Sequence, residues 1–114
     1  MAVTAKKRGE PLLGRWRIVE MERWDRDYIN LVVPGYLQFE DDEMGSFQFG
    51  TVQGWMDCRP ERIGKQERVE FSWEGQSDSD PACGRGWAIV KESELHGRIY
   101  IHCGDDSWFK AVKV

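Results

Sequence analysis

Along most of the chain, apolar and polar residues alternate over short stretches, as in β-strands that bury one face. Clusters of Gly, Asp and Pro separate these stretches at close intervals. The pattern predicts eight strands: Arg15–Glu22, Tyr36–Glu40, Ser46–Phe49, Val52–Arg59, Arg68–Glu74, Arg85–Lys91, Leu95–Cys103 and Ser107–Val112. Short turns favour pairing between sequence neighbours, and an even number of strands lets the last close on the first. We therefore expect an all-β fold, an eight-stranded antiparallel up-and-down (meander) barrel.

One segment carries a helical pattern. Trp24, Tyr28 and Leu31 are spaced i, i+4 and i+7, Asp25 can cap the N-terminus, and Pro34 stops the helix. We expect one short helix, over residues 24–34, between the first two strands. Residues 1–11 are polar and basic without periodicity, so they are expected to form a flexible N-terminal arm before a single domain at 12–114.

The segment 13–16, Leu-Gly-Arg-Trp, resembles the G-x-W signature that opens the first strand of lipocalins and their calycin relatives. The resemblance implies a barrel with Trp16 plugging the closed end and with ligand access at the end that carries the helix. The chain is shorter than a typical lipocalin and lacks the Arg expected near the end of the last strand. It is more similar to the compact lipocalin-like barrels of uncharacterised bacterial proteins, and the likeness bears on fold more than on function.

The hairpin around Ser93 decides which side chains of two strands face the lumen. A three-residue turn centred on Ser93 would place Trp87, Ile89 and Arg85 inside, opposite Ile99, Gly97 and Ile101. An inward Arg85 would need a carboxylate, an anionic ligand or water. The alternative, which we favour, is that Arg85 extends to solvent with its stem packed on Trp87.

The strand Arg68–Glu74 alternates cleanly, so Val69, Phe71 and Trp73 are predicted to face inward. Its neighbour Val52–Arg59 leaves two alternatives open. Either Trp55 faces the lumen, together with a hydrogen-bonded pair of Asp57 and Arg59, or the opposite face does and these residues lie on the surface.

Composition excludes several classes of partner. The formal charge of −4, with both signs interspersed, provides no basic stripe for nucleic acid. No apolar run approaches the roughly 20 residues of a membrane-spanning helix, and no signal peptide is recognisable. Three widely spaced cysteines, Cys58, Cys83 and Cys103, are expected as free thiols in the cytoplasm.

Candidate chemistry gathers at the barrel end that carries the helix, whose rim is predicted to be acidic and aromatic. No metal-ligand spacing, nucleophile motif or phosphate loop is present, so no metal, cofactor or catalytic residue is predicted. We expect a monomer or homodimer that binds a small, partly apolar ligand without catalysis; the alternatives are a protein-interaction barrel with a side-chain-filled interior and, more weakly, a small hydrolase-type enzyme. The candidate ligand-binding residues are Arg85, Trp55, Asp57, Arg59, Trp73, Trp87, His102 and Trp108.

Overall fold

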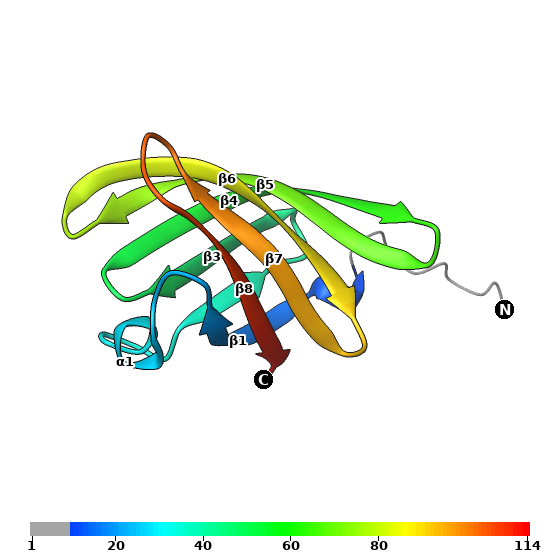
Figure 1. Cartoon of the computed structure of the whole chain (residues 1–114). Coiled ribbons are helices and arrows are strands. Elements are labelled where there is room, and N and C mark those ends of the chain that lie inside the picture. The colour runs from blue at the N-terminus through cyan, green and yellow to red at the C-terminus, as the bar shows by residue number, and fades with distance from the viewer. Residues whose placement is uncertain (1–9) are drawn as a thin grey trace, which may run out of the picture.

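Eight strands close into one antiparallel barrel in the computed structural model, which describes residues 10–114 (Figure 1). The elements are η1 (Glu10–Leu12), β1 (Gly14–Met21), α1 (Arg26–Ile29), β2 (Tyr36–Phe39), β3 (Met44–Phe49), β4 (Val52–Ile63), β5 (Gln66–Ser77), β6 (Asp80–Lys91), β7 (Glu94–Ile101) and β8 (Asp106–Lys113). Each strand pairs with its sequence neighbours, and β8 closes on β1. The predicted meander barrel is confirmed. The predicted arm falls on residues 1–9, outside the described part, and on the first two residues of η1.

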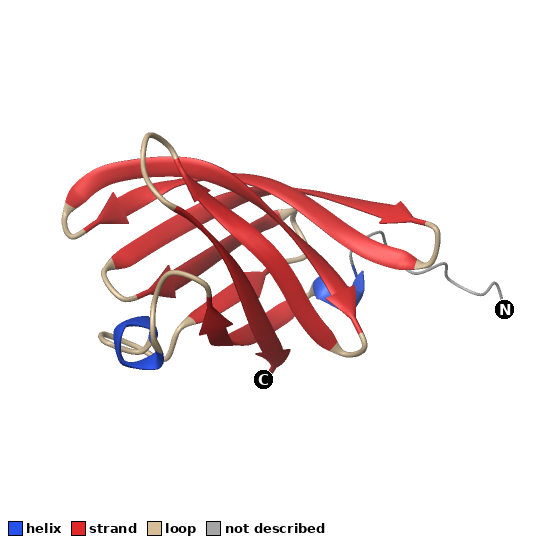
Figure 2. Cartoon of the chain, viewed as in Figure 1, coloured by secondary structure: helices blue, strands red, loops and turns tan. Residues whose placement is uncertain are grey.

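Helical structure is confined to η1 and α1 within the described chain (Figure 2). Neither has the length or hydropathy of a membrane-spanning segment. Asp25 caps α1 as predicted, accepting a hydrogen bond from the Tyr28 amide at 2.9 Å. The helix is four residues long and not eleven, because Asn30 ends it and turns its side chain back to accept a bond from the Gly35 amide. Leu31, expected on its buried face, is exposed.

The strands β4, β5 and β6 are each 12 residues long, and their hairpins project beyond the neighbouring strands (Figure 1). The loop predicted at 75–84 is wrong, because β5 continues to Ser77, β6 begins at Asp80, and only Asp78 and Ser79 form the turn. Gly, Gln, Ser, Pro and Ala fill this stretch, so neither face shows the apolar alternation that marks a strand.

A two-residue turn joins β6 to β7, so the register between these two strands differs from the predicted one. Lys91 pairs with Glu94, and the two residues between them, Glu92 and Ser93, have positive φ angles of 53° and 67°. Such turns suit the right-handed twist of a hairpin. The three-residue turn predicted around Ser93 is therefore wrong by one position, which moves every β6 side chain to the opposite face.

The corrected register turns Trp87, Ile89 and Arg85 outward, while Ala88 and Gly86 face the lumen. Packing explains this phase. A Cβ on Gly86 would lie 2.4 Å from Cζ of the Phe71 ring, so the lumen at this level holds the ring only because β6 offers no side chain there.

The open question about β4 is settled by burial. Met56 and Cys58 are 0% and 3% exposed, whereas Trp55 is 52% exposed. Trp55, Asp57 and Arg59 therefore lie on the outside of the barrel, the second of the two alternatives. On the next strand, β5, the predicted inward residues are confirmed, since Val69, Phe71 and Trp73 are all buried.

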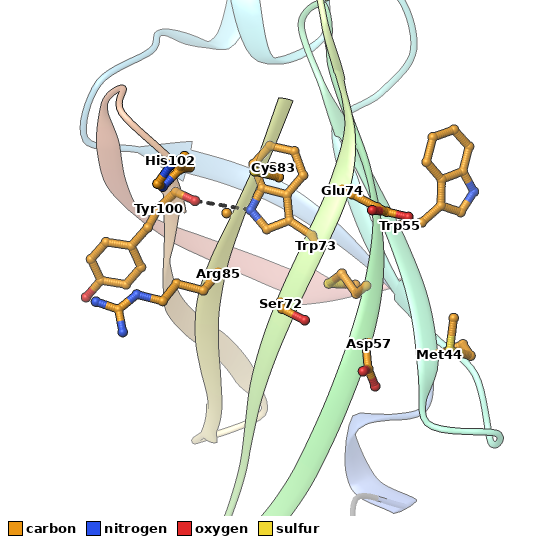
Figure 3. A pocket seen from close by; sticks show the side chains of 12 residues that line it. Met44, Trp55, Asp57, Ser72, Trp73, Glu74, Cys83, Arg85, Tyr100 and His102 are labelled. Carbon is orange, nitrogen blue, oxygen red and sulfur yellow. Dashed lines mark hydrogen bonds between the residues drawn. The ribbon is translucent and has the colours of Figure 1, made fainter. Parts of the chain in front are cut away.

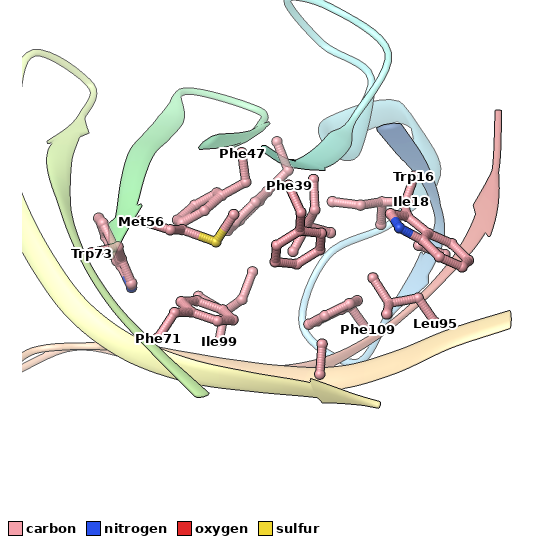
Figure 4. Packing of buried hydrophobic residues seen from close by; sticks show 14 of the residues in the cluster. Trp16, Ile18, Phe39, Phe47, Met56, Phe71, Trp73, Leu95, Ile99 and Phe109 are labelled. Atoms are coloured by element: carbon pink, nitrogen blue, oxygen red, sulfur yellow. The ribbon is translucent and has the colours of Figure 1, made fainter. Parts of the chain in front are cut away.

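Large apolar side chains fill the lumen (Figure 4). Phe47 packs edge-on against Trp73 at 5.0 Å and parallel to Phe49 at 5.9 Å between ring centroids. At the opposite end Trp16 is 2% exposed and donates its indole N–H to the Leu12 carbonyl, a position consistent with the plug that the G-x-W resemblance implies. The space left near Leu12 is about 40 Å³, room for a few water molecules and no more.

The barrel end with α1, expected to be the ligand mouth, is covered. Trp24 lies 4.9 Å from Phe49 between ring centroids, and the Tyr28 hydroxyl is 3.2 Å from Oγ1 of Thr51 in the turn between β3 and β4. Tyr28 also lies directly on Gly50, where a Cβ would come within 2.1 Å of its ring. Because α1 packs over the lumen here, the expected access route is closed.

Candidate functional site

The outer face of β4 to β7 carries an open depression of about 760 Å³, which we call the Trp55 depression (Figure 3). Its lining residues come from β3 to β7 and the turn after β7: Met44, Trp55, Met56, Asp57, Ser72, Trp73, Glu74, Cys83, Gly84, Arg85, Tyr100 and His102. In Figure 3, Trp55 and Met44 lie on one side and Arg85, Tyr100 and His102 on the other.

Register explains why the surface is hollowed at this place. One cross-strand row holds Trp55, Glu74 and Cys83, and the next holds Asp57, Ser72, Arg85 and Tyr100. The two central strands thus contribute small side chains, Ser72 and Cys83, between the large ones of β4 and β7. The lowest part of the surface lies where the outward side chains are shortest.

The floor of the depression is held by a contact through the sheet. The buried Trp73 donates its indole N–H to the Tyr100 carbonyl, 3.1 Å away on β7, past Gly84 of the intervening β6. A Cβ on Gly84 would fall 1.8 Å from that carbonyl oxygen and 2.9 Å from the indole nitrogen. Only glycine allows this approach of the Tyr100 carbonyl to the Trp73 indole across β6.

Arg85 is the charged group of this depression best placed to meet a ligand. Its guanidinium carbon lies 5.1 Å from the centroid of the Tyr100 ring, and no carboxylate of residues 10–114 is within ion-pair distance of it. Glu74 likewise has no ion-pair partner in this part of the chain. The depression therefore presents one free cation and one free carboxylate beside two aromatic rings.

Asp57 and Arg59 form the predicted pair, but on the surface. Two guanidinium nitrogens of Arg59 bond the two carboxylate oxygens of Asp57. The hydrogen bond to Asp57 raises the pKa of Arg59, and the carboxylate's charge adds to the shift. Both side chains are more than half exposed, so water and salt screen the pair and it contributes little to stability.

In the described part of the chain, the nucleophilic groups near the depression have no base hydrogen-bonded to them. The His102 amide donates to the Cys83 carbonyl at 2.7 Å, yet within residues 10–114 the imidazole bonds neither Cys83, Cys103 nor an aspartate. A nucleophile needs a base within hydrogen-bond reach. No group of three or more His, Cys, Asp or Glu side chains in that range is placed to hold a metal ion. The side chains that line the depression can stack, form ion pairs and donate or accept hydrogen bonds.

Comparisons with protein-family models, curated proteins and solved structures gave no match.

A second depression of about 420 Å³ adjoins the first on the same face and shares Arg85 and Tyr100 with it. It is lined by Arg59, Arg68, Glu70, Phe71, Arg85, Gly86, Trp87 and Tyr100. We call it the arginine depression.

Seven of the eight predicted site residues line these two depressions. Six of them lie on the outside of the barrel, and the seventh, Trp73, is buried in the lumen and lines the floor. Five line the Trp55 depression, namely Trp55, Asp57, Trp73, Arg85 and His102, and Arg59 and Trp87 line the arginine depression. Trp108 on β8 is 37% exposed and lines neither. The ligand-binding role of all eight stays a prediction.

Sequence reasoning missed Arg68 as a site residue and Tyr100 as the partner of Arg85. The clean alternation of β5 already places Arg68 outside. The predicted three-residue turn already places Tyr100 outside, but opposite Gly86. The two-residue turn pairs Tyr100 with Arg85 and turns Arg85 outward as well.

Proposed function

We propose that this protein is a non-enzymatic binding barrel that holds a small, partly apolar ligand on the outer face of β4 to β7, in the Trp55 depression. The observation that carries the proposal is Arg85. Its guanidinium has no ion-pair partner among the described residues and lies over the Tyr100 ring, at the edge of a depression that also exposes Trp55. Exposed aromatic rings offer apolar contact, and a guanidinium offers directed hydrogen bonds to an anionic group.

The lumen is the alternative place for a ligand, and its packing speaks against it. Phe47, Leu37 and Met56 are 0% exposed, and the α1 end is covered by Trp24 and Tyr28. A ligand inside would have to displace side chains that already make close contacts, which costs the packing free energy they contribute.

The finer parts of the proposal are a lipocalin-like, calycin-like ancestry among small bacterial proteins and a place in the cytoplasm. The closed eight-stranded meander with Trp16 buried at one end supports the first. The thiols of Cys83 and Cys103, exposed and free, support the second, because such thiols persist best in a reducing compartment.

Nuclear magnetic resonance of the indole N–H groups tests the binding site directly, since the chain has six tryptophans at different places. A library of metabolites that combine an apolar part with a charged group is titrated into the labelled protein. We expect a ligand that shifts the Trp55 signal strongly and the Trp16 signal, at the far end of the lumen, hardly at all.

The variant Trp55→Phe should weaken binding of that ligand by about fivefold, because phenylalanine keeps one aromatic ring but loses the larger area and the N–H of the indole. Trp108→Phe is the matched control, because Trp108 is also exposed but lies outside the two depressions. Equal losses in both variants, or shifts confined to lumen signals, would contradict the proposal.

A second candidate function, recognition of a protein partner through the same face, is favoured by its open shape. Small-ligand sites usually enclose most of their ligand, whereas Trp, Tyr and Arg on an open surface are the residues that dominate protein interfaces. Light scattering and affinity capture from lysate distinguish the two: a monomer that retains no partner but binds a metabolite at Trp55 excludes this candidate.

A further inference from the structure

Three arginines from three adjacent strands meet in the arginine depression. Arg59 on β4, Arg68 on β5 and Arg85 on β6 line it, and Glu70 is the single carboxylate among its lining residues. The lining therefore carries a formal charge of +2, three cations less one anion, on a chain whose net charge is −4. Asp57 and Glu61 lie outside the lining but pair with Arg59 and Arg68 and offset those two charges, so the attraction for an anion depends mainly on Arg85.

Two of these guanidinium groups are held against aromatic rings. The guanidinium carbon of Arg68 lies 4.8 Å from the Trp87 ring centroid, and that of Arg85 lies 5.1 Å from the Tyr100 ring centroid. A guanidinium stacked on a ring keeps its in-plane N–H donors free for an oxyanion, and the ring limits the side chain's freedom before binding.

The three arginines differ in their existing partners. Arg59 is paired with Asp57, and Arg68 with Glu61 and Glu70 at 3.2 and 3.3 Å. These partners are exposed, so the pairs are weak and an arriving anion competes with them at little cost. Arg85 has no such partner within residues 10–114 and is the first contact for an incoming anion.

We propose that the arginine depression is an oxyanion subsite, and that the ligand of this protein is an elongated amphipathic anion. Its carboxylate, sulfonate or phosphate is bound by Arg85 and Arg68, and its apolar part extends into the Trp55 depression. This inference rests on the proposed function and adds the chemical class of the ligand. Trp55 and Arg85 are two strands and one cross-strand row apart, about 12 Å between backbone positions, so the ligand is roughly that long.

A matched pair of fluorescent probes tests the inference. 8-Anilinonaphthalene-1-sulfonate and N-phenyl-1-naphthylamine share one ring system and differ by the sulfonate. We expect the sulfonate probe to bind the native protein about tenfold more tightly at low salt, from one added charge-assisted contact, and to lose this advantage as salt increases. Both probes should shift the Trp55 indole signal, and the sulfonate probe should in addition shift that of Trp87.

The variant Arg85→Gln should reduce the preference for the sulfonate probe to less than about threefold, and Arg68→Gln should reduce it in part. Arg15→Gln is the control, since Arg15 also lies over a ring, that of Tyr36 at 4.1 Å, but on β1 away from both depressions. Arg15 and Arg85 are exposed and Arg68 is half-buried on the outer face of the barrel, so all three variants should fold. A native-like amide spectrum checks this.

The outcomes separate the two proposals. Equal affinity of the two probes with shifts at Trp55, or a sulfonate preference that persists in Arg85→Gln, overturns the oxyanion subsite and leaves the outer binding site standing. If the metabolite library and both probes leave the Trp55 signal unchanged, the proposed function fails and the subsite fails with it.

Discussion

At the residue scale, burial gives identical side chains different chemistry. Cys58 faces the lumen and is 3% exposed, whereas Cys83 and Cys103 are exposed. Burial raises the pKa of the Cys58 thiol from its ordinary value of 9.0 to about 12, and the neighbouring Asp57 charge adds to the shift. Because the thiolate is the reactive form, Cys58 is expected to be inert in the folded protein.

We predict that a disulfide exchange reagent at pH 8 titrates two thiols rapidly in the native protein and the third only after unfolding. Replacing Cys83 or Cys103 by Ser should each remove one fast thiol, and Cys58→Ala should remove none. Three equally fast thiols in the native protein would contradict the placement of Cys58.

The raised pKa of Cys58 makes the free energy of unfolding depend on pH in the alkaline range. The native thiol holds its proton to higher pH than the unfolded one, so the stabilisation is complete below pH 9 and declines as pH rises towards 12. Between pH 8.5 and 10.5 the unfolding free energy of the native sequence should fall by about 2 kcal/mol more than that of Cys58→Ala. Urea unfolding of both proteins at the two pH values measures this; parallel losses would refute it.

At the element scale, the number and order of strands were predictable, but their length and register were not. Strands with one apolar face, such as β5 with Val69, Phe71 and Trp73, identify themselves by alternation. The outer half of the β5–β6 hairpin does not, because beyond Gly75 its two faces carry small and polar side chains. For β4 and β6, the sequence did not show which face points to the lumen, because Trp55 and Trp87 are aromatic and yet face outward.

The candidate site, too, was predictable only in part. The residue types were predictable, because Arg85, Trp55 and Asp57 stand out by their chemistry wherever they face. The side of the barrel on which they lie was not predictable. A turn of two residues, Glu92 and Ser93, places Arg85 on the surface, whereas a turn of three residues would place it in the lumen. Neither turn residue is Gly or Asn, so the sequence lacks the usual mark of a two-residue turn.

That turn gives a prediction at the element scale. Both central residues have positive φ, a conformation that Asn and Gly adopt with less strain than Glu and Ser. The double variant Glu92→Asn with Ser93→Gly should therefore raise the unfolding free energy by about 1 kcal/mol, measured by urea denaturation. The same Asn-Gly pair at Asp41 and Asp42, neither of which has positive φ, should give no gain. If the turn instead had three residues, the substitutions at 92 and 93 would give no more stability than those at 41 and 42.

At the scale of the whole molecule, core and candidate site are separate parts of one sheet. Side chains that alternate along β4 to β7 fill the lumen on one face and form the two depressions on the other. The two parts touch in the floor, where the buried Met56, Trp73 and Phe71 line the depressions from the lumen side and Trp73 bonds the Tyr100 carbonyl. Stability and binding should therefore respond to different substitutions.

Phe47 allows this separation to be measured. Its ring is fully buried between Phe49 and Trp73, so Phe47→Leu should lower the unfolding free energy by about 1 to 2 kcal/mol through lost packing. Because the ring lies inside the barrel, the affinity for the sulfonate probe should stay within about twofold of that of the native sequence, whereas Arg85→Gln should show the reverse, weaker binding at unchanged stability. If Phe47→Leu instead increased the probe affinity tenfold or more, the space freed in the lumen would be the binding place, and the depressions outside would hold no ligand.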